Sequence, residues 1–123
     1  LRHAARILSE GVRSTDLVGR IGGEEFMVVL PDTTHDAAVH LARKLHARMR
    51  AQPVQLPGGQ QVTVTASFGV SAVPAGADGS MSSLHAAADH ALYEAKRTGR
   101  DQVHAHMPDG MPPAQDFERQ RKH

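Results

Sequence analysis

The sequence predicts an α/β fold in which helices pack on a mainly antiparallel sheet. Apolar residues recur at three- and four-residue steps over residues 1–12, 37–49 and 84–95, which is the pattern of one buried helix face. Between these segments lie short apolar runs bounded by glycine, proline and small polar residues, the pattern of β-strands. The expected order is therefore helix, two strands, helix, strand, helix and strand.

The size and composition of the chain fit one domain. Its 123 residues can bury a core, which must rest on aliphatic side chains because there is no Trp, one Tyr and three Phe. The net charge of +1, with histidines neutral, argues against a general nucleic-acid or membrane-surface binder, which needs concentrated positive charge. The absence of Cys excludes disulfides and thiolate zinc sites and is compatible with a reducing cytoplasm. The nine histidines show no tight metal spacing, so none is assigned as a ligand.

The first half of the chain is expected to hold two helices with a hairpin between them. The first helix covers residues 1–12. A strand at 17–21 meets a second strand at 26–30 across a turn whose glycines can adopt positive φ. The second helix begins after the turn at 31–34 and ends at about Ala51, because a proline follows shortly after.

The second half is expected to add a strand, a helix and a last strand. Residues 62–70 alternate apolar and polar side chains more regularly than any other segment, and Gly69 within them indicates a bulge or the close approach of another backbone. A third helix covers residues 82–98 and stops at a glycine, and a short strand follows at 102–105. Residues 107–123 hold three prolines and mixed charges, which is typical of a mobile tail or a linker.

Two adjacent carboxylates follow the glycine pair of the hairpin turn. Gly22 and Gly23 lack side chains, so a ligand can lie against backbone N–H groups, and Glu24 and Glu25 stand at the start of the next strand. Paired carboxylates suit a divalent metal such as magnesium, which often shares its oxygen ligands with substrate phosphates. A further ligand is expected, and no third carboxylate stands out on a strand of its own. The alternative is an ordinary surface hairpin with solvated glutamates.

Two pairs of charged residues are further candidates for a binding site. Lys96 and Arg100 lie one helical turn apart at the end of the third helix, where they can hold a polyphosphate; alternatively they complement the helix dipole, which is worth about 0.3–1 kcal/mol. Arg13 can engage the O6/N7 edge of guanine, with Asp16 accepting from the opposite edge. For this second pair the alternative is a local ion pair at a helix end.

These motifs together resemble the diguanylate cyclase (GGDEF) family. Five residues separate the Arg-x-x-Asp sequence of Arg13 and Asp16 from the sequence Gly-Gly-Glu-Glu-Phe at 22–26, which resembles the signature loop of the family. Residues 65–70 resemble its Ser-x-Gly-Val strand, and residues 89–100 resemble its last helix. The resemblance covers about residues 1–104. It implies a nucleotidyl-cyclase-like fold with a ferredoxin-like sheet.

The resemblance also implies an activity, which is the condensation of two GTP into cyclic di-GMP with release of pyrophosphate, one GTP on each subunit of a homodimer. Glu24 would bind metal and act as, or near, the base, and Glu25 would help to hold a second metal, Mg²⁺ or Mn²⁺. Gly22 and Gly23 would admit the nucleotide. The terminal phosphates would be held by the basic pair of the third helix, Lys96 and Arg100.

A second site is implied at Arg13 and Asp16, which resemble the inhibitory site of the family, where cyclic di-GMP binds and slows the enzyme. Whether Lys44 or Arg43 completes it is open. An alternative function is an inactive GGDEF module that senses cyclic di-GMP or GTP, and a third is a plain interaction domain. The intact pair of glutamates argues against a module that only binds.

The sequence begins at Leu1-Arg2, which resembles the Leu-Arg just after the Asn-Asp-x-x-Gly-His-x-x-Gly-Asp segment of the family. The resemblance places the first central strand, a metal-binding aspartate and the guanine-recognising Asn and Asp before it. Residues 1–106 are therefore expected to form a partial GGDEF domain, inactive alone, and residues 107–123 a tail. The full-length protein is expected to be cytoplasmic or membrane-anchored with this domain in the cytoplasm, to carry an upstream sensory domain and not to bind nucleic acid.

Overall fold

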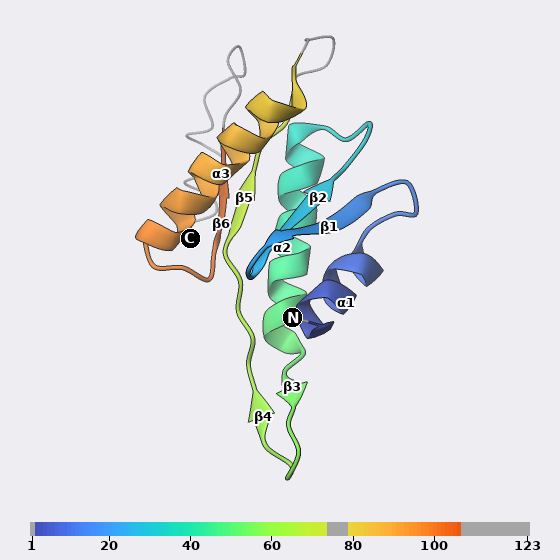
Figure 1. Ribbon diagram of the computed structural model, residues 1–123, viewed down its shortest axis with the longest axis vertical. Helices are drawn as coiled ribbons and strands as arrows, with labels where there is room; N and C mark the ends of the chain where they lie inside the picture. Colours follow the sequence, from blue (N-terminus) through green and yellow to red (C-terminus); the bar gives the residue numbers. More distant parts are fainter. Residues whose placement is uncertain (1, 74–78, 107–123) are drawn as a thin grey trace.

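The computed structural model describes residues 2–73 and 79–106. Within these ranges the chain forms three helices and six strands, and the two long helices lie on either side of the last two strands (Figure 1). The helices are α1 (Arg2–Gly11), α2 (His35–Ala51) and α3 (Met81–Arg97). The strands are β1 (Leu17–Gly22), β2 (Glu25–Val29), β3 (Val54–Gln55), β4 (Gln61–Val62), β5 (Phe68–Val70) and β6 (Val103–Ala105). The mixed α/β class predicted from the sequence is confirmed.

The centre of the core lies between α1 and α2. Ile7 and Leu8 on α1 pack with Leu45 and Met49 on α2, and all four side chains are buried. Leu8, Leu45 and Met49 belong to the apolar stripes that predicted the two helices, whereas Ile7 lies outside the predicted stripe of α1. Thr34 caps α2 by accepting a hydrogen bond from the Ala37 N–H (3.1 Å), as the turn before the helix predicted.

The hairpin of β1 and β2 is antiparallel and within one residue of its predicted bounds. Leu17 pairs with Val29, and the register shifts between Arg20 and Gly22 at the turn. Gly22 and Gly23 have φ values of 154° and 50°, which explains why glycine occupies this turn. The hairpin therefore carries the two glutamates at its tip, away from the core.

The predicted strand at 62–70 is wrong as a continuous element. Its two ends are strands, but β4 pairs with β3 and β5 pairs with β6, in two separate sheets. Residues 63–67 pair with no strand in the described part of the chain, so alternation alone overstated the strand. The β3–β4 hairpin projects beyond the end of α2 (Figure 1).

The last helix lies against the parallel pair of β5 and β6. Phe68 pairs with Val103 and Val70 with Ala105 in a regular register, so Gly69 marks no bulge. A Cβ at Gly69 would overlap the Ala88 carbonyl oxygen and the backbone of Leu92 on α3. The second predicted alternative, close approach of another backbone, is therefore the one observed.

The three sheets are two-stranded, and two of them are antiparallel. In the described residues, β2 and β5 are not hydrogen-bonded to each other. Within those residues no helix combines the length and apolar character needed to cross a membrane. The predicted tail at 107–123 and residues 74–78 lie outside the described residues, as does Leu1.

Candidate functional site

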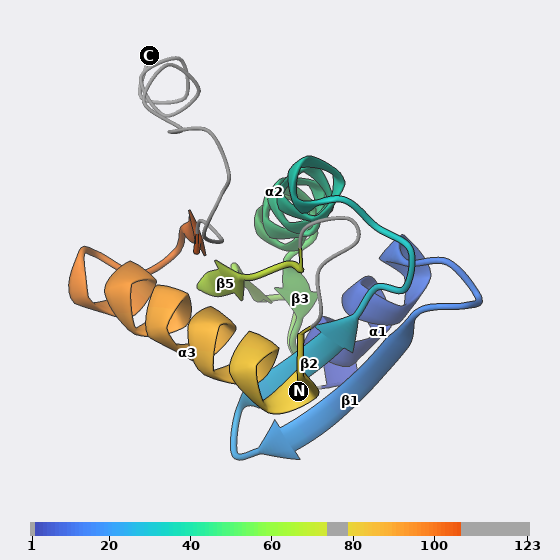
Figure 2. The same cartoon turned by 90° about the horizontal axis from the view of Figure 1, so that it is seen from above.

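A groove of about 1650 Å³ runs between β2 and β5 and reaches the end of α3. Its walls come from the β1–β2 hairpin, α2, the segment leading into β5, and α3. In Figure 2 the hairpin reaches across toward α3. Six residues singled out in the sequence line this one groove: Gly22, Gly23, Glu24, Glu25, Lys96 and Arg100.

The tip of the hairpin and the last turn of α3 are joined by an ion pair. The Lys96 Nζ atom lies 3.6 Å from the Glu25 Oε2 atom, and the two side chains are 35% and 45% exposed. Glu24, on the neighbouring position, is exposed at the groove. A lysine that merely complemented the dipole of its own helix would need no carboxylate from another element. The ion pair therefore shows that Lys96 also joins two elements, beyond any interaction with the dipole of its own helix.

The two glutamates offer the kind of ligands that magnesium takes. Adjacent carboxylates with free faces can hold a hard cation whose remaining ligands are phosphate oxygens and water. Among residues 2–73 and 79–106, no group of three or more His, Cys, Asp or Glu side chains is arranged to hold a metal. The carboxylates of Glu24 and Glu25 thus suit a metal ion that takes its other ligands from a phosphate, and they do not form a complete metal site by themselves.

Arg100 enters the groove from the turn that ends α3. The helix ends at Arg97, Gly99 (φ 129°) follows its cap, and the Arg100 N–H donates to the Ala95 carbonyl (2.8 Å), a bond that caps the C-terminus. The described residues provide no hydrogen bond or ion pair to the Arg100 guanidinium. This side chain is therefore available to an anion in the groove.

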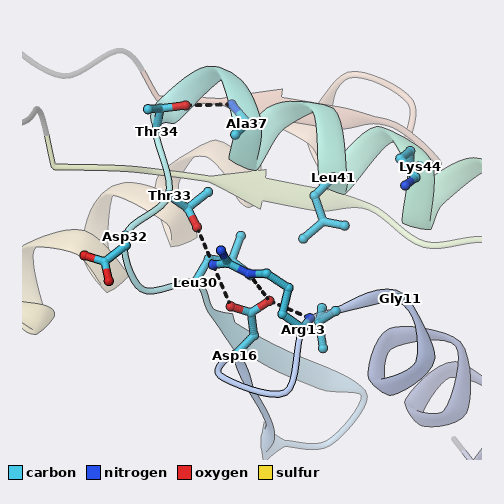
Figure 3. A pocket seen from close by; sticks show the side chains of 11 residues that line it. Gly11, Arg13, Asp16, Leu30, Asp32, Thr33, Thr34, Ala37, Leu41 and Lys44 are labelled. Carbon is cyan, nitrogen blue, oxygen red and sulfur yellow. Dashed lines mark hydrogen bonds and ion pairs between the residues drawn. The ribbon is translucent and has the colours of Figure 1, made fainter.

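A second and smaller pocket, of about 420 Å³, holds the other predicted pair (Figure 3). The Arg13 Nη2 group donates to Asp16 Oδ1 (3.0 Å), and the Arg13 backbone N–H donates to Asp16 Oδ2 (2.8 Å). Arg13 Nη2 also donates to the Pro31 carbonyl (2.7 Å) and to Thr33 Oγ1 (2.9 Å). The local ion pair weighed as the simpler alternative is thus present, in a pocket that leaves the Arg13 side chain 56% exposed.

The electrostatics of this pocket follow from the same contacts. The Asp16 side chain is only 1% exposed, and the hydrogen bond from the Arg13 side chain holds the pKa of Asp16 below its ordinary value despite that burial. The same bond raises the pKa of Arg13. Lys44 lines the pocket from α2, together with Leu41, whereas Arg43 is not among its lining residues. Of the two basic residues that the sequence left open as a third member of this site, Lys44 is the one that lines the pocket.

Sequence reasoning missed contacts that join distant segments. Thr33 was expected only as part of a turn, but its hydroxyl accepts from Arg13, 20 residues away. Asp101 was not considered, although it joins the end of α3 to α2 through His46 and Arg50. His46 and Arg50 lie 55 and 51 positions before Asp101, so no local pattern signals these contacts.

Comparison with known proteins agrees with the fold and with the motif at the groove. The model of the diguanylate cyclase GGDEF domain family matches residues 1–102. The chain belongs to the GGDEF domain family. It is similar to the uncharacterized protein YhcK of Bacillus subtilis, with 38% identity over 78% of this chain and 26% of YhcK. It is also similar to the diguanylate cyclase DgcP of Pseudomonas aeruginosa, with 37% identity over 84% of this chain and 15% of DgcP.

A solved structure shares the fold. The active GGEEF domain of a diguanylate cyclase from Vibrio cholerae superposes with a TM-score of 0.74 and 29% identity, over 89% of this chain and 67% of that one. The chain spans about a quarter of YhcK and less of DgcP, so these relatives extend well beyond the region of similarity.

Proposed function

We propose that the protein containing this chain is a diguanylate cyclase that condenses two GTP into cyclic di-GMP with release of pyrophosphate. The observation that carries the proposal is the ion pair between Lys96 and Glu25, at 3.6 Å, in the groove that also holds Arg100. It gathers carboxylates and cations from two elements, as binding of a nucleoside triphosphate with its metal requires. Membership of the family and similarity to named diguanylate cyclases support the same reaction.

Each predicted residue has a role in this reaction that its position suits. Gly22 and Gly23 leave the backbone of the turn open to the nucleotide, and Glu24 accepts the proton of the 3′-hydroxyl or lies beside the group that does. Glu24 and Glu25 would hold Mg²⁺ or Mn²⁺, which when bound neutralises phosphate charge. Lys96 and Arg100 hold the terminal phosphates and stabilise the charge of the departing pyrophosphate. Because each 3′-hydroxyl must attack the α-phosphate of the other GTP, two subunits face each other.

Cyclic di-GMP also acts as an inhibitor in this proposal, at the pocket of Arg13 and Asp16. The exposed Arg13 guanidinium suits the acceptor edge of guanine, and Lys44 adds a positive charge for a phosphate. Because Arg13 already donates to Asp16, Pro31 and Thr33, the product would meet a side chain fixed in place. We place the domain in the cytoplasm, where GTP is available, under the control of an upstream sensory domain.

The full-length protein incubated with GTP and Mg²⁺ tests the reaction, with the products separated and identified by mass spectrometry. We expect cyclic di-GMP and pyrophosphate in a ratio of one to two, as two phosphodiester bonds form. Binding of cyclic di-GMP without any turnover would instead support a sensor module.

A further inference from the structure

The loop that carries Arg100 has an unusual backbone. Gly99, Arg100 and Asp101 have φ values of 129°, 60° and 51° in succession. Left-handed conformations are unfavourable for residues with a Cβ, although Asp tolerates them better than most. Two such residues in sequence persist only where the surroundings hold them.

Asp101 provides that hold from three directions. Its Oδ1 atom accepts from the His46 Nε2–H (2.7 Å), and its Oδ2 atom accepts from Arg50 Nη1 (2.5 Å), both on α2. Its backbone N–H donates to Ser67 Oγ (3.0 Å), in the segment that leads into β5. The Asp101 side chain is only 26% exposed, so its bonds to α2 are partly shielded from water.

These contacts bear on Arg100 because they hold the backbone next to it, and no hydrogen bond in the described residues holds its side chain. The backbone N–H of Arg100 is bonded to the end of α3, and the next residue is bonded to α2 and to Ser67. The guanidinium itself has no protein partner in residues 2–73 and 79–106. The direction in which it enters the groove is therefore set by the backbone on either side of it.

We propose that Asp101 is a positioning residue, which through His46 and Arg50 on α2 holds Arg100 in the conformation that binds the terminal phosphates of the nucleotide. The inference rests on the proposed function, since it concerns the same groove. Asp101 also lines the groove, but His46 and Arg50 engage its carboxylate, so its effect on the nucleotide passes through Arg100. It keeps the Arg100 side chain oriented, so that this side chain loses less conformational freedom when the phosphate binds.

The test removes the carboxylate of Asp101 while the left-handed conformation stays accessible. Asp101→Gly in the full-length protein keeps the left-handed conformation accessible but removes the carboxylate. GTP affinity in the presence of Mg²⁺ is measured by titration calorimetry, with calcium replacing magnesium where turnover interferes. We expect binding to weaken roughly tenfold, as for loss of most of one oriented charged contact. Asp101→Asn keeps one carbonyl acceptor and should weaken binding less.

A double variant decides whether the effect passes through Arg100. If it does, Arg100→Ala weakens GTP binding, and adding Asp101→Gly to Arg100→Ala weakens it no further.

Glu94→Gln is the matched control, because it removes the ion pair with Arg97 (2.6 Å) at the same helix end and should leave GTP binding unchanged. Thermal unfolding of each variant confirms that it folds; if Asp101→Gly does not, Arg50→Ala, which removes one exposed partner of Asp101, takes its place.

The outcomes are distinct. A wild-type protein that does not bind GTP overturns the proposed function and this inference with it. A wild type that binds GTP, with Arg100→Ala weakened and Asp101→Gly unchanged, overturns the inference alone. Additive effects in the double variant also overturn it, because Asp101 would then act independently of Arg100.

Discussion

Lys96 on α3 and Glu25 on β2 are 71 positions apart in the sequence, and their charged atoms lie 3.6 Å apart. The pair joins the tip of the hairpin to the end of the last helix across the mouth of the groove. It holds the Lys96 ammonium group beside the Glu25 carboxylate. Both side chains are partly exposed, so the pair contributes little to stability. In the proposed reaction it exchanges partners when a phosphate and its metal bind.

Replacement of Lys96 by Met should weaken GTP binding. The methionine keeps the length of the apolar stem but loses a charged contact worth about 1.5–3 kcal/mol, which corresponds to roughly a 10- to 150-fold rise in the dissociation constant. Arg97→Met is the matched control, since Arg97 pairs with Glu94 and does not line the groove. Equal GTP affinities for wild type and Lys96→Met would show that Lys96 does not bind the phosphates.

Replacement of Gly69 by Ala should destabilise the fold by displacing α3 from β5. The added Cβ would meet the Ala88 carbonyl oxygen and the Leu92 backbone, and main-chain atoms of a helix cannot move aside singly. Overpacking of this kind costs about 1–3 kcal/mol, measured as a lower midpoint of denaturant unfolding. Gly19→Ala is the control, because a Cβ added there would have no other atom within 4 Å. Equal losses in both variants would contradict the close packing at Gly69.

Replacement of Arg13 by Ala should remove inhibition by product and spare early turnover. Arg13 lines the smaller pocket and not the groove of Glu24, although five lining residues are common to both, so initial rates before product accumulates should match wild type. Cyclic di-GMP affinity should fall at least roughly tenfold with the loss of a charged donor. Arg6→Ala removes an exposed arginine that pairs with Glu10 on α1 and serves as the control. Unchanged product affinity in Arg13→Ala would rule the pocket out as the inhibitory site.

The effect of Asp16→Asn on thermal stability should depend on pH. Arg13 holds the folded-state pKa of Asp16 below its ordinary value of about 3.9, so the ionised carboxylate stabilises the folded state above that pH. The contribution is lost as the pH falls through the lower, folded-state pKa. The difference in melting temperature between wild type and Asp16→Asn should therefore be full near neutral pH and shrink below about pH 4. A difference that grows on acidification would contradict the direction of the shift.

Local pattern predicted most of the elements and little of their pairing. The helices followed from apolar periodicity, and their ends from Thr34, Pro53 and Gly99, because caps and breakers act on their immediate neighbours. The strand at 62–70 was overstated because alternation reports which face is buried and not which strand is the partner. The short strand β3 carried too little pattern to be predicted, and it forms by pairing with β4.

The candidate site could be predicted residue by residue but not as an arrangement. Glycines, carboxylates and basic residues at fixed spacing indicated Gly22 to Glu25 and the pair of Lys96 and Arg100. Only the fold shows that both groups line one groove, and that Arg13 lies in another pocket. Asp101 could not be found at all, since its partners on α2 become neighbours only through tertiary packing.

The central claim is that the hairpin tip performs catalysis, and the rate of cyclic di-GMP formation by Glu24→Gln in the full-length protein tests it most directly. Glutamine keeps the shape of the side chain but neither takes up a proton nor offers a charged ligand, so the rate should fall about 10²–10⁴-fold. Glu10→Gln, on the exposed face of α1, should match wild type. A Glu24→Gln protein that forms cyclic di-GMP at the wild-type rate would contradict the account.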